Sequence, residues 1–244
     1  GKVIENTPFE NVYISHSPSD VGNSIGAALY VAHNLKNEDR DTTFNSSYLG
    51  PSFSDEEIKK TLERRKIIYK KVENIPKTVA DILSRGEIIA RFDGRMEFGE
   101  RALGNRSILA DPRAKNIKDK INSIIKYREN YRPFAPVVTQ EKVCNYFDVS
   151  ENFTCNYMEK VVQIKKDFHN ELPAVTHVDG SGRVQTVNEK HNQSFYQIIK
   201  EFELLTGLPI VLNTSFNIAG EPVVLSPDDA ISTFYNSGLE YLMI

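Results

Sequence analysis

Residues 91–136 read RFDGRMEFGERALGNRSILADPRAKNIKDKINSIIKYRENYRPFAP and carry eleven Lys and Arg against six Asp and Glu. The whole chain of 244 residues has a formal net charge of −3 at pH 7, so positive charge is concentrated in this stretch. Seven of its cations are Arg, whose planar guanidinium pairs with phosphate or carboxylate oxygens two at a time. The stretch indicates an anion-binding site, although charge alone favours a solvated basic face.

The same stretch predicts the central elements of the fold. Apolar runs at 88–92 and 107–110 are typical of buried strands, and Pro133 and Pro136 favour an extended path into a third. Between them, isoleucines recur at the spacing of an amphipathic helix that rests on a sheet. These are Ile117, Ile121, Ile124 and Ile125.

The C-terminal part alternates strand and helix patterns. Further strands are predicted at 161–164, 174–178, 184–187, 210–212 and 240–244. Helices are predicted at 141–147, at 195–205 ending at Gly207, and from Pro227 onward. Connections too long for hairpins join these elements. The pattern predicts an α/β domain with a mixed, twisted sheet and flanking helices.

The N-terminal part predicts a separate unit. A strand-like run at 12–14 is followed by a helix at 23–35, and residues 37–53 are a polar connector. Ser54 and Glu57 form a capping-box pattern that opens a helix predicted to run to Glu73. Asn74-Ile75-Pro76 breaks that helix, so we divide the chain into 1–75 and 76–244. Because no element precedes the strand at 12–14, we expect the chain to be a piece of a longer protein.

Composition excludes several classes of protein. With 40% hydrophobic and 26% charged residues the chain is of ordinary globular type. No apolar run approaches the roughly 18 to 20 residues of a membrane helix. Cys144 and Cys155 lack a CxxC or metal-ligand spacing, which fits structural thiols in a reducing compartment. We therefore expect a soluble, cytoplasmic protein without a membrane partner.

Three polar clusters fall where predicted strands or helices end, which is where open α/β sheets place ligands. They are Lys126 with Arg128 and Arg132; Thr176 and His177 with Arg183; and the NTSFN turn at 213–217. Walker A, GxGxxG, protein-kinase and GxSxG patterns are absent from the sequence. Cationic side chains with Ser and Asn donors can instead hold a nucleotide triphosphate and a small anion. A lone histidine such as His177 is more often structural.

Four long motifs resemble the C-terminal region of the O-carbamoyltransferases, which include nodulation-factor and antibiotic enzymes. They are GRMEFGERALGNRSILADPR, KYRENYRPFAP, PAVTHVDGSGRVQTV and LNTSFNIAGEPVVLSPDDA. The resemblance covers about residues 87–244 and extends upstream to SPSDVGNSIGAALY. It implies a YrdC-like domain that makes carbamoyl-adenylate from carbamoyl phosphate and ATP, with Mg²⁺ beside ATP.

The resemblance also implies roles for individual residues. Ser215 and Asn217 match the signature that contacts the nucleotide phosphates, and Lys126, Arg128 and Arg132 match the motif that grips both substrates. Further expected pocket members are Arg95, Arg101, Arg106, Thr176, His177 and Arg183. Three departures concern pocket shape: Glu100 replaces a usual Pro, SGR at 181–183 replaces TAR, and TCNYM replaces a segment like SPFM.

Residues 1–75 resemble the end of an actin-like-fold domain that transfers the carbamoyl group to an acceptor hydroxyl with Fe²⁺. Asp20 falls on a metal ligand of that family, whereas the sequence context alone favours a helix N-cap. His16 and His33 do not reproduce the spacing of the family's metal-binding histidines. A single carboxylate does not hold a transition metal, so we expect the iron site and full transfer activity only in a longer chain.

Two hypotheses follow. The chain is the C-terminal part of an ATP-dependent O-carbamoyltransferase, whose partners are carbamoyl phosphate, ATP, a small hydroxyl acceptor and the N-terminal domain of the same polypeptide. The alternative is a non-catalytic nucleotide- or RNA-binding module; its aromatic residues, including Tyr127 and Tyr131, lie where core packing is expected instead. The first hypothesis requires Lys126, Arg128 and Arg132 to converge with Ser215 and Asn217.

Overall fold

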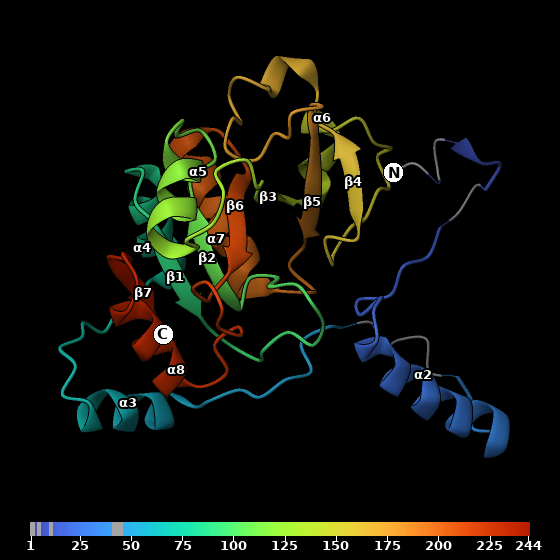
Figure 1. The fold of residues 1–244 in the computed structure, drawn as a ribbon, viewed down its shortest axis with the longest axis horizontal. Coiled ribbons are helices and arrows are strands. Elements are labelled where there is room, and N and C mark those ends of the chain that lie inside the picture. Colours follow the sequence, from blue (N-terminus) through green and yellow to red (C-terminus); the bar gives the residue numbers. More distant parts are fainter. Residues whose placement is uncertain (1–2, 4–5, 10–11, 41–45) are drawn as a thin grey trace.

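A mixed sheet forms the centre of the protein in this computed structural model, which describes residues 3, 6–9, 12–40 and 46–244 (Figure 1). The strand order among the described residues is β4-β5-β3-β6-β2-β1-β7. The strands are β1 (Ile89–Phe92), β2 (Arg106–Ala110), β3 (Ala135–Thr139), β4 (Lys160–Gln163), β5 (Ser181–Val187), β6 (Ile210–Ser215) and β7 (Tyr241–Met243). The β1–β7 and β3–β5 pairs are parallel and the other pairs antiparallel, which confirms the predicted mixed sheet.

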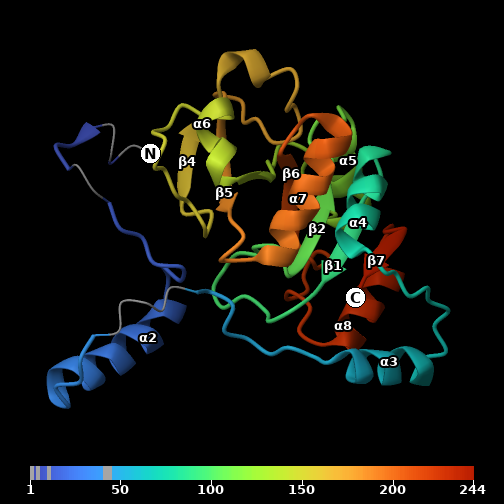
Figure 2. The same ribbon diagram turned by 180° about the vertical axis from the view of Figure 1, so that it is seen from behind.

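Helices cover both faces of the sheet. The pair α4 (Ile75–Ser84) and α7 (Gln193–Thr206) lies in front of the sheet in Figure 2, while α5 (Ile117–Lys120) lies on the opposite face, in front in Figure 1. The apolar stripe of α7 is fully buried because it faces the sheet and α4. The remaining helical elements are α2 (Val21–Tyr30), η1 (Val31–Leu35), α3 (Asp55–Arg64), η2 (Ile121–Ile125), η3 (Gln140–Lys142), α6 (Val143–Tyr146), η4 (Lys166–Phe168) and α8 (Pro227–Tyr235).

Several helix ends form as the sequence predicts. The Ser54–Glu57 capping box opens α3, and Gly207 ends α7 in the left-handed conformation at φ 77°. Pro227 occupies the first turn of α8, behind a second capping box formed by Ser226 and Asp229. These helix ends could be predicted from the sequence because each capping pattern depends only on residues that are close together in the chain.

The register of the sheet brings the ends of four strands together at one edge. Ser215, the last residue of β6, pairs with Ser107 at the start of β2. On its other side β6 runs antiparallel to β3, with Asn213 opposite Ala135 at the start of β3. Because β5 is parallel to β3, its first residues lie at this edge as well. The end of β6 and the starts of β2, β3 and β5 therefore share one edge, which we call the site edge.

The N-terminal part has two kinds of structure. Helix α2 contains no buried residue and extends away from the sheet in both views (Figures 1 and 2). Residues 46–53 instead run along the body, where the Gly50 and Met96 backbones bond at 2.9 Å. The predicted connector lies partly outside the described residues, at 41–45. The actin-like origin of 1–75 and the boundary near residue 75 stay predictions.

Three predicted elements are wrong. Helix α3 ends at Arg64 instead of Glu73, because Lys66 adopts a left-handed conformation (φ 57°) and the following Ile-Ile-Tyr run has low helix propensity. Residues 174–178 form turns, since the Leu172 carbonyl accepts both the backbone N–H and the hydroxyl of Thr176. The 12–14 run pairs with no strand among the described residues.

None of the helices in the described part of the chain has the length and apolar character needed to cross a membrane. Both cysteines are free thiols, with Cys155 buried and Cys144 partly exposed. The sequence predicted free thiols at both positions, and the structure agrees.

Candidate anion-binding site

The arginines of residues 91–136 do not form one basic surface. Arg91 is fully buried and pairs with Asp93 at 2.5 Å, and Arg113 pairs with Asp111 at 2.6 Å. These two guanidinium groups already have carboxylate partners within the fold. Their charges are therefore paired within the fold, although the Arg113 side chain stays 33% exposed.

Arg95 and Arg106, both expected in the pocket, are also bound internally. Arg95 donates to the Leu49 and Gly50 carbonyls at 2.8 and 3.0 Å. Arg106 is fully buried, donates to the Asp93 carbonyl at 2.7 Å, and lies over the Phe92 ring at 3.7 Å from its centroid. Arg95 lies in the turns that follow β1, and the Arg106 guanidinium is bound by carbonyls of the same turns. The Arg106 backbone begins β2 at the site edge, where its carbonyl accepts the Phe216 N–H at 2.8 Å, and a ligand role for either arginine stays a prediction.

Lys126 lies at the site edge and contacts the turn that follows β6. Its Nζ atom is 2.6 Å from the Ser215 carbonyl oxygen and 3.1 Å from Ser215 Oγ. It is also 3.0 Å from the Asn217 carbonyl oxygen and 2.7 Å from Asn217 Oδ1. Residues some 90 positions apart thus meet, and for Lys126 the predicted convergence with Ser215 and Asn217 is confirmed. Among the described residues no hydrogen bond joins Arg128 or Arg132 to Ser215 or Asn217, so their part of the convergence stays a prediction. We call Lys126, Arg128, Arg132, Ser215 and Asn217 the Lys126 cluster.

A π-helical turn directs Lys126 toward this contact. The element η2 follows α5 directly, and the Lys126 N–H bonds to the Ile121 carbonyl at 2.9 Å, five residues back. Ile121 and Ile125 are fully buried and anchor the turn on the sheet. Tyr127 then takes a left-handed φ of 44°, which turns the chain back toward β3. Such π turns are often found at functional sites.

The two arginines of the Lys126 cluster add positive charge beside Lys126. Arg128 donates to Asn122 Oδ1 at 2.6 Å and lies 4.8 Å from the centroid of the Phe134 ring. Arg132 is exposed, and its guanidinium has no hydrogen bond or ion pair to any described residue. Arg128 and Arg132 therefore stand near Lys126 without a salt bridge among the described residues.

The electrostatics of the Lys126 cluster favour an incoming anion. Burial, and then the Arg128 guanidinium, lower the pKa of Lys126 to about 7. Burial and Arg132 likewise lower the pKa of Arg128, although Glu129 opposes this. Lowered pKa values mean that positive charge is disfavoured in the folded protein. A bound phosphate would relieve that penalty, because it supplies the missing counter-charge.

A second cationic group lies at the start of β5. Burial, and then the charge of Arg101, lower the pKa of Arg183, so the two guanidinium groups are neighbours. Arg101 is exposed, and neither side chain forms a hydrogen bond or ion pair with a described residue. Lys118, which the sequence did not single out, joins this group because its charge acts on His177. We call Arg101, Arg183, His177 and Lys118 the Arg183 cluster.

The loop at 97–105 holds Arg101 in place. The buried Glu97 carboxylate accepts the Leu103 and Asn105 N–H groups at 2.7 and 2.8 Å. Gln185 donates to the Leu103 carbonyl at 2.9 Å, and Asn213 donates to the carbonyl of Ala102 at 3.0 Å. The sequence analysis did not predict these hydrogen bonds to the loop. Asn213 could have been singled out as part of the NTSFN turn, whereas nothing in the sequence distinguishes Glu97 from other charged loop residues.

Thr176 and His177 lie in the turns that lead into β5. The Thr176 hydroxyl donates to the Leu172 carbonyl at 2.7 Å and so stabilises the turn. His177 Nδ1 is 3.0 Å from Ser181 Oγ. Burial lowers the pKa of His177; Asp179 opposes this, and Arg183 and Lys118 add to it. The structure thus brings His177 to Arg183, and it leaves Thr176 in a structural contact.

The two clusters are close enough to serve one ligand set. Strand β3 alone separates β5 from β6, and neighbouring strands lie about 4.8 Å apart, so β5 and β6 are about 10 Å apart. The Lys126 cluster stands at the end of β6, and Arg183 stands near the start of β5. This spacing suits a polyphosphate together with a small anion.

A metal centre does not fit the residues that the structure describes. Asp20 is exposed and stands at the N-cap position of α2, where its side chain makes no capping hydrogen bond. Within the described ranges no three His, Cys, Asp or Glu side chains come together as metal ligands. The Lys126 and Arg183 clusters supply cationic side chains, which are not ligands for a metal ion. Iron at Asp20 stays a prediction for a longer chain.

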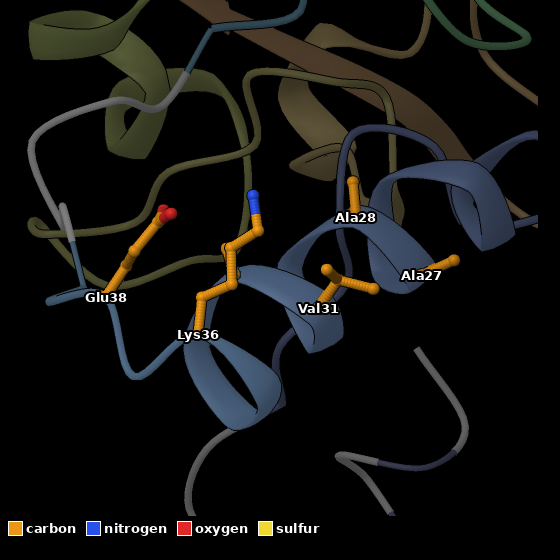
Figure 3. Close-up of a pocket in the computed structure, with 6 residues that line it drawn as sticks. Ala27, Ala28, Val31, Lys36 and Glu38 are labelled. Atoms are coloured by element: carbon orange, nitrogen blue, oxygen red, sulfur yellow. The ribbon is translucent and has the colours of Figure 1, made fainter.

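A shallow apolar hollow lies elsewhere, on α2 and η1 (Figure 3). It is lined by Ala27, Ala28, Val31, Ala32, Lys36 and Glu38. None of the predicted site residues lines it. The anion site is therefore separate from this hollow.

The structure is a mixed α/β fold with two groups of cationic side chains along one edge of its sheet. Residues 80–244 match the family described as Carbamoyltransferase C-terminus, and the chain belongs to that family. Nodulation protein NolO of Bradyrhizobium diazoefficiens is 38% identical over 248 residues, which cover 100% of this chain and 45% of that protein. Nodulation protein U of Rhizobium fredii is 33% identical over 212 residues, covering 87% of this chain and 34% of that protein.

The chain thus spans less than half the length of these curated relatives. Among solved structures, the crystal structure of T. kodakarensis HypF is similar, with a TM-score of 0.50 and 17% sequence identity. The similarity covers 69% of this chain and 20% of that one, and it shows the fold alone.

Proposed function

We propose that this chain is the C-terminal part of an ATP-dependent O-carbamoyltransferase, and that the site edge binds ATP and carbamoyl phosphate. The observation that carries the proposal is the Lys126 cluster, where cations without a salt bridge meet the turn after β6. Membership of the carbamoyltransferase family supplies the class of reaction. Transfer to the acceptor hydroxyl is assigned to the longer protein.

The chemistry proposed for the site is formation of carbamoyl-adenylate. Water cleaves the bond between the carbonyl carbon and the phosphate oxygen of carbamoyl phosphate, which releases phosphate and leaves carbamate. A carbamate oxygen then attacks the α-phosphorus of ATP, and pyrophosphate leaves with the electron pair of the broken bond. Cationic side chains catalyse this step by stabilising charge that builds on the phosphoryl oxygens.

The residues of the two clusters divide these tasks. Arg128 and Arg132 neutralise the ATP phosphates, since their guanidinium groups have hydrogen-bonding capacity left. Lys126 fixes the turn at Ser215 and Asn217, through which the chain approaches the nucleotide. Arg101 and Arg183 bind the smaller anion. Lys126 and Arg128 are held by neutral oxygen atoms, and none of these five cations has a carboxylate partner among the described residues.

Pyrophosphate release tests the proposal. The chain, incubated with MgATP and carbamoyl phosphate, should release pyrophosphate only when both are present, and Arg128→Ala should lower the rate at least tenfold. Arg113→Ala is a matched control, because Arg113 is bound to Asp111 and should leave the rate within about twofold. Failure to bind ATP, together with no pyrophosphate, would exclude the proposed chemistry.

One observation favours the alternative of a nucleotide- or RNA-binding module. Tyr127 and Tyr131 are 59% and 74% exposed, so the expectation that they pack in the core is wrong. They alternate with Arg128 and Arg132, a pattern typical of single-strand binders. Steep weakening of RNA affinity with rising salt, without ATP turnover, would favour this alternative.

A further inference from the structure

One atom of the Arg183 cluster has no hydrogen-bond partner. His177 Nε2 is shielded from solvent and meets no donor or acceptor among the described residues. A buried polar atom without a partner destabilises a fold by about 1–3 kcal/mol. Such atoms are rare in native proteins, and one reason for them is a partner supplied by a ligand.

The surrounding hydrogen bonds determine what Nε2 offers. The Ser181 hydroxyl donates to Asp179 Oδ1 at 2.6 Å, because an ionised carboxylate only accepts. Ser181 Oγ therefore presents a lone pair to His177 Nδ1, 3.0 Å away, and Nδ1 carries the proton. Since the pKa of His177 is lowered from its ordinary value, the ring is neutral at pH 7. Nε2 is then a hydrogen-bond acceptor.

The charged groups around His177 are of both signs. The Asp179 carboxylate already accepts the Ser181 N–H and hydroxyl, whereas Arg183 and Lys118 are cations that can bind the oxygens of an anion. Neither Lys118 nor Arg183 is held by a hydrogen bond or ion pair to a described residue, so both side chains can move when an anion arrives. The Arg183 cluster thus fits a ligand with an anionic group and, beside it, an N–H or O–H donor.

Carbamoyl phosphate has this pattern, with a phosphate on one side of the carbonyl and an NH₂ group on the other. We propose that His177 Nε2 accepts a hydrogen bond from the carbamoyl NH₂ group, and that this contact selects carbamoyl phosphate over acyl phosphates with a methyl group there. The inference rests on the proposed function and adds a specificity-determining residue to it. A site built for an N–H donor rejects an isostere that lacks it, because the acceptor is left unpaired.

Two stable phosphonates that differ only in the NH₂ group test whether His177 recognises it. Phosphonoacetamide carries the NH₂ group, and 2-oxopropylphosphonate carries a methyl group in its place. Calorimetry on the 244-residue chain at pH 7.5 should give about tenfold tighter binding of the amide, the effect of one hydrogen bond. The His177→Ala variant should bind both ligands equally, within about twofold.

Matched variants separate this role from a structural one. Arg183→Ala should weaken both phosphonates alike and keep their ratio, because it removes only a phosphate contact. Ser181→Ala should lower the ratio, since it releases the His177 ring, and His177→Gln should restore part of it by supplying an amide oxygen. The Gln variant also keeps the test valid if His177→Ala does not fold.

The outcomes are distinguishable from failure of the proposed function. If the wild-type chain releases pyrophosphate with carbamoyl phosphate but binds the two phosphonates equally, or if His177→Ala keeps the tenfold ratio, the role of His177 is refuted alone. If carbamoyl phosphate supports no pyrophosphate release and neither phosphonate binds, the proposed function fails and this inference fails with it.

Discussion

Binding of ATP should be coupled to uptake of a proton at Lys126. Its pKa of about 7 leaves Lys126 about one-tenth protonated at pH 8 in the free protein. The phosphates of ATP supply the counter-charge that the Lys126 cluster lacks, and so return the pKa toward its ordinary value near 10.5. Binding at pH 8 should therefore take up about 0.9 proton, against about 0.5 at pH 7.

Calorimetry in HEPES and in Tris measures this uptake, because the two buffers differ in ionisation enthalpy. At pH 8 the terminal phosphate of ATP is already ionised, since phosphate monoesters lose their second proton near pH 6. In the Lys126→Arg variant the uptake should fall close to zero, as arginine is charged throughout. Uptake below about 0.2 proton in the wild type, or equal uptake in the Arg variant, would refute this account of the site.

Three further predictions concern stability and packing. The folded pKa of Lys126 lies below its unfolded value, so this residue destabilises the fold fully below pH 7 and less as pH rises toward 10.5. Relative to the wild type, the Lys126→Met variant should accordingly gain about 3 kcal/mol more free energy of unfolding at pH 6 than at pH 9, as measured by urea unfolding. A stability difference between variant and wild type that does not change with pH would contradict this. Glu97→Ala should lower the free energy of unfolding by about 3 kcal/mol, because two backbone N–H groups lose a charged acceptor. Glu100 is exposed, so Glu100→Ala should change that free energy by less than about 0.5 kcal/mol. Amides of α2 should exchange with solvent far faster than those of α7, since α2 buries nothing; equal protection would show that α2 is packed in solution.

The sequence predicted much of the architecture because its signals are local. Apolar runs marked the central strands, and capping residues such as Ser54 and Pro227 marked helix starts. The mixed character of the sheet followed from connections too long for hairpins. The order of the strands was not predictable, since it depends on pairings between residues distant in sequence.

The candidate site was predicted only in part, because charge in a sequence does not show which cations find partners in the fold. The motifs marked Arg128 as a substrate-binding residue and Arg106 as a further pocket member, but they did not show that the Arg106 guanidinium donates to the Asp93 carbonyl. The direction of the Lys126 side chain depends on the π-helical turn η2, for which no sequence signal was recognised. The run at 174–178 has strand composition, but its backbone bonds locally around Leu172.

Formation of carbamoyl-AMP at the site edge from carbamoyl phosphate and ATP is tested most directly by measuring pyrophosphate release alongside trapping of carbamoyl-AMP. Both products should depend on carbamoyl phosphate and MgATP together, and Arg128→Ala should lower both at least tenfold while Arg113→Ala should not. ATP binding without either product, or equal rates in the two variants, would contradict it.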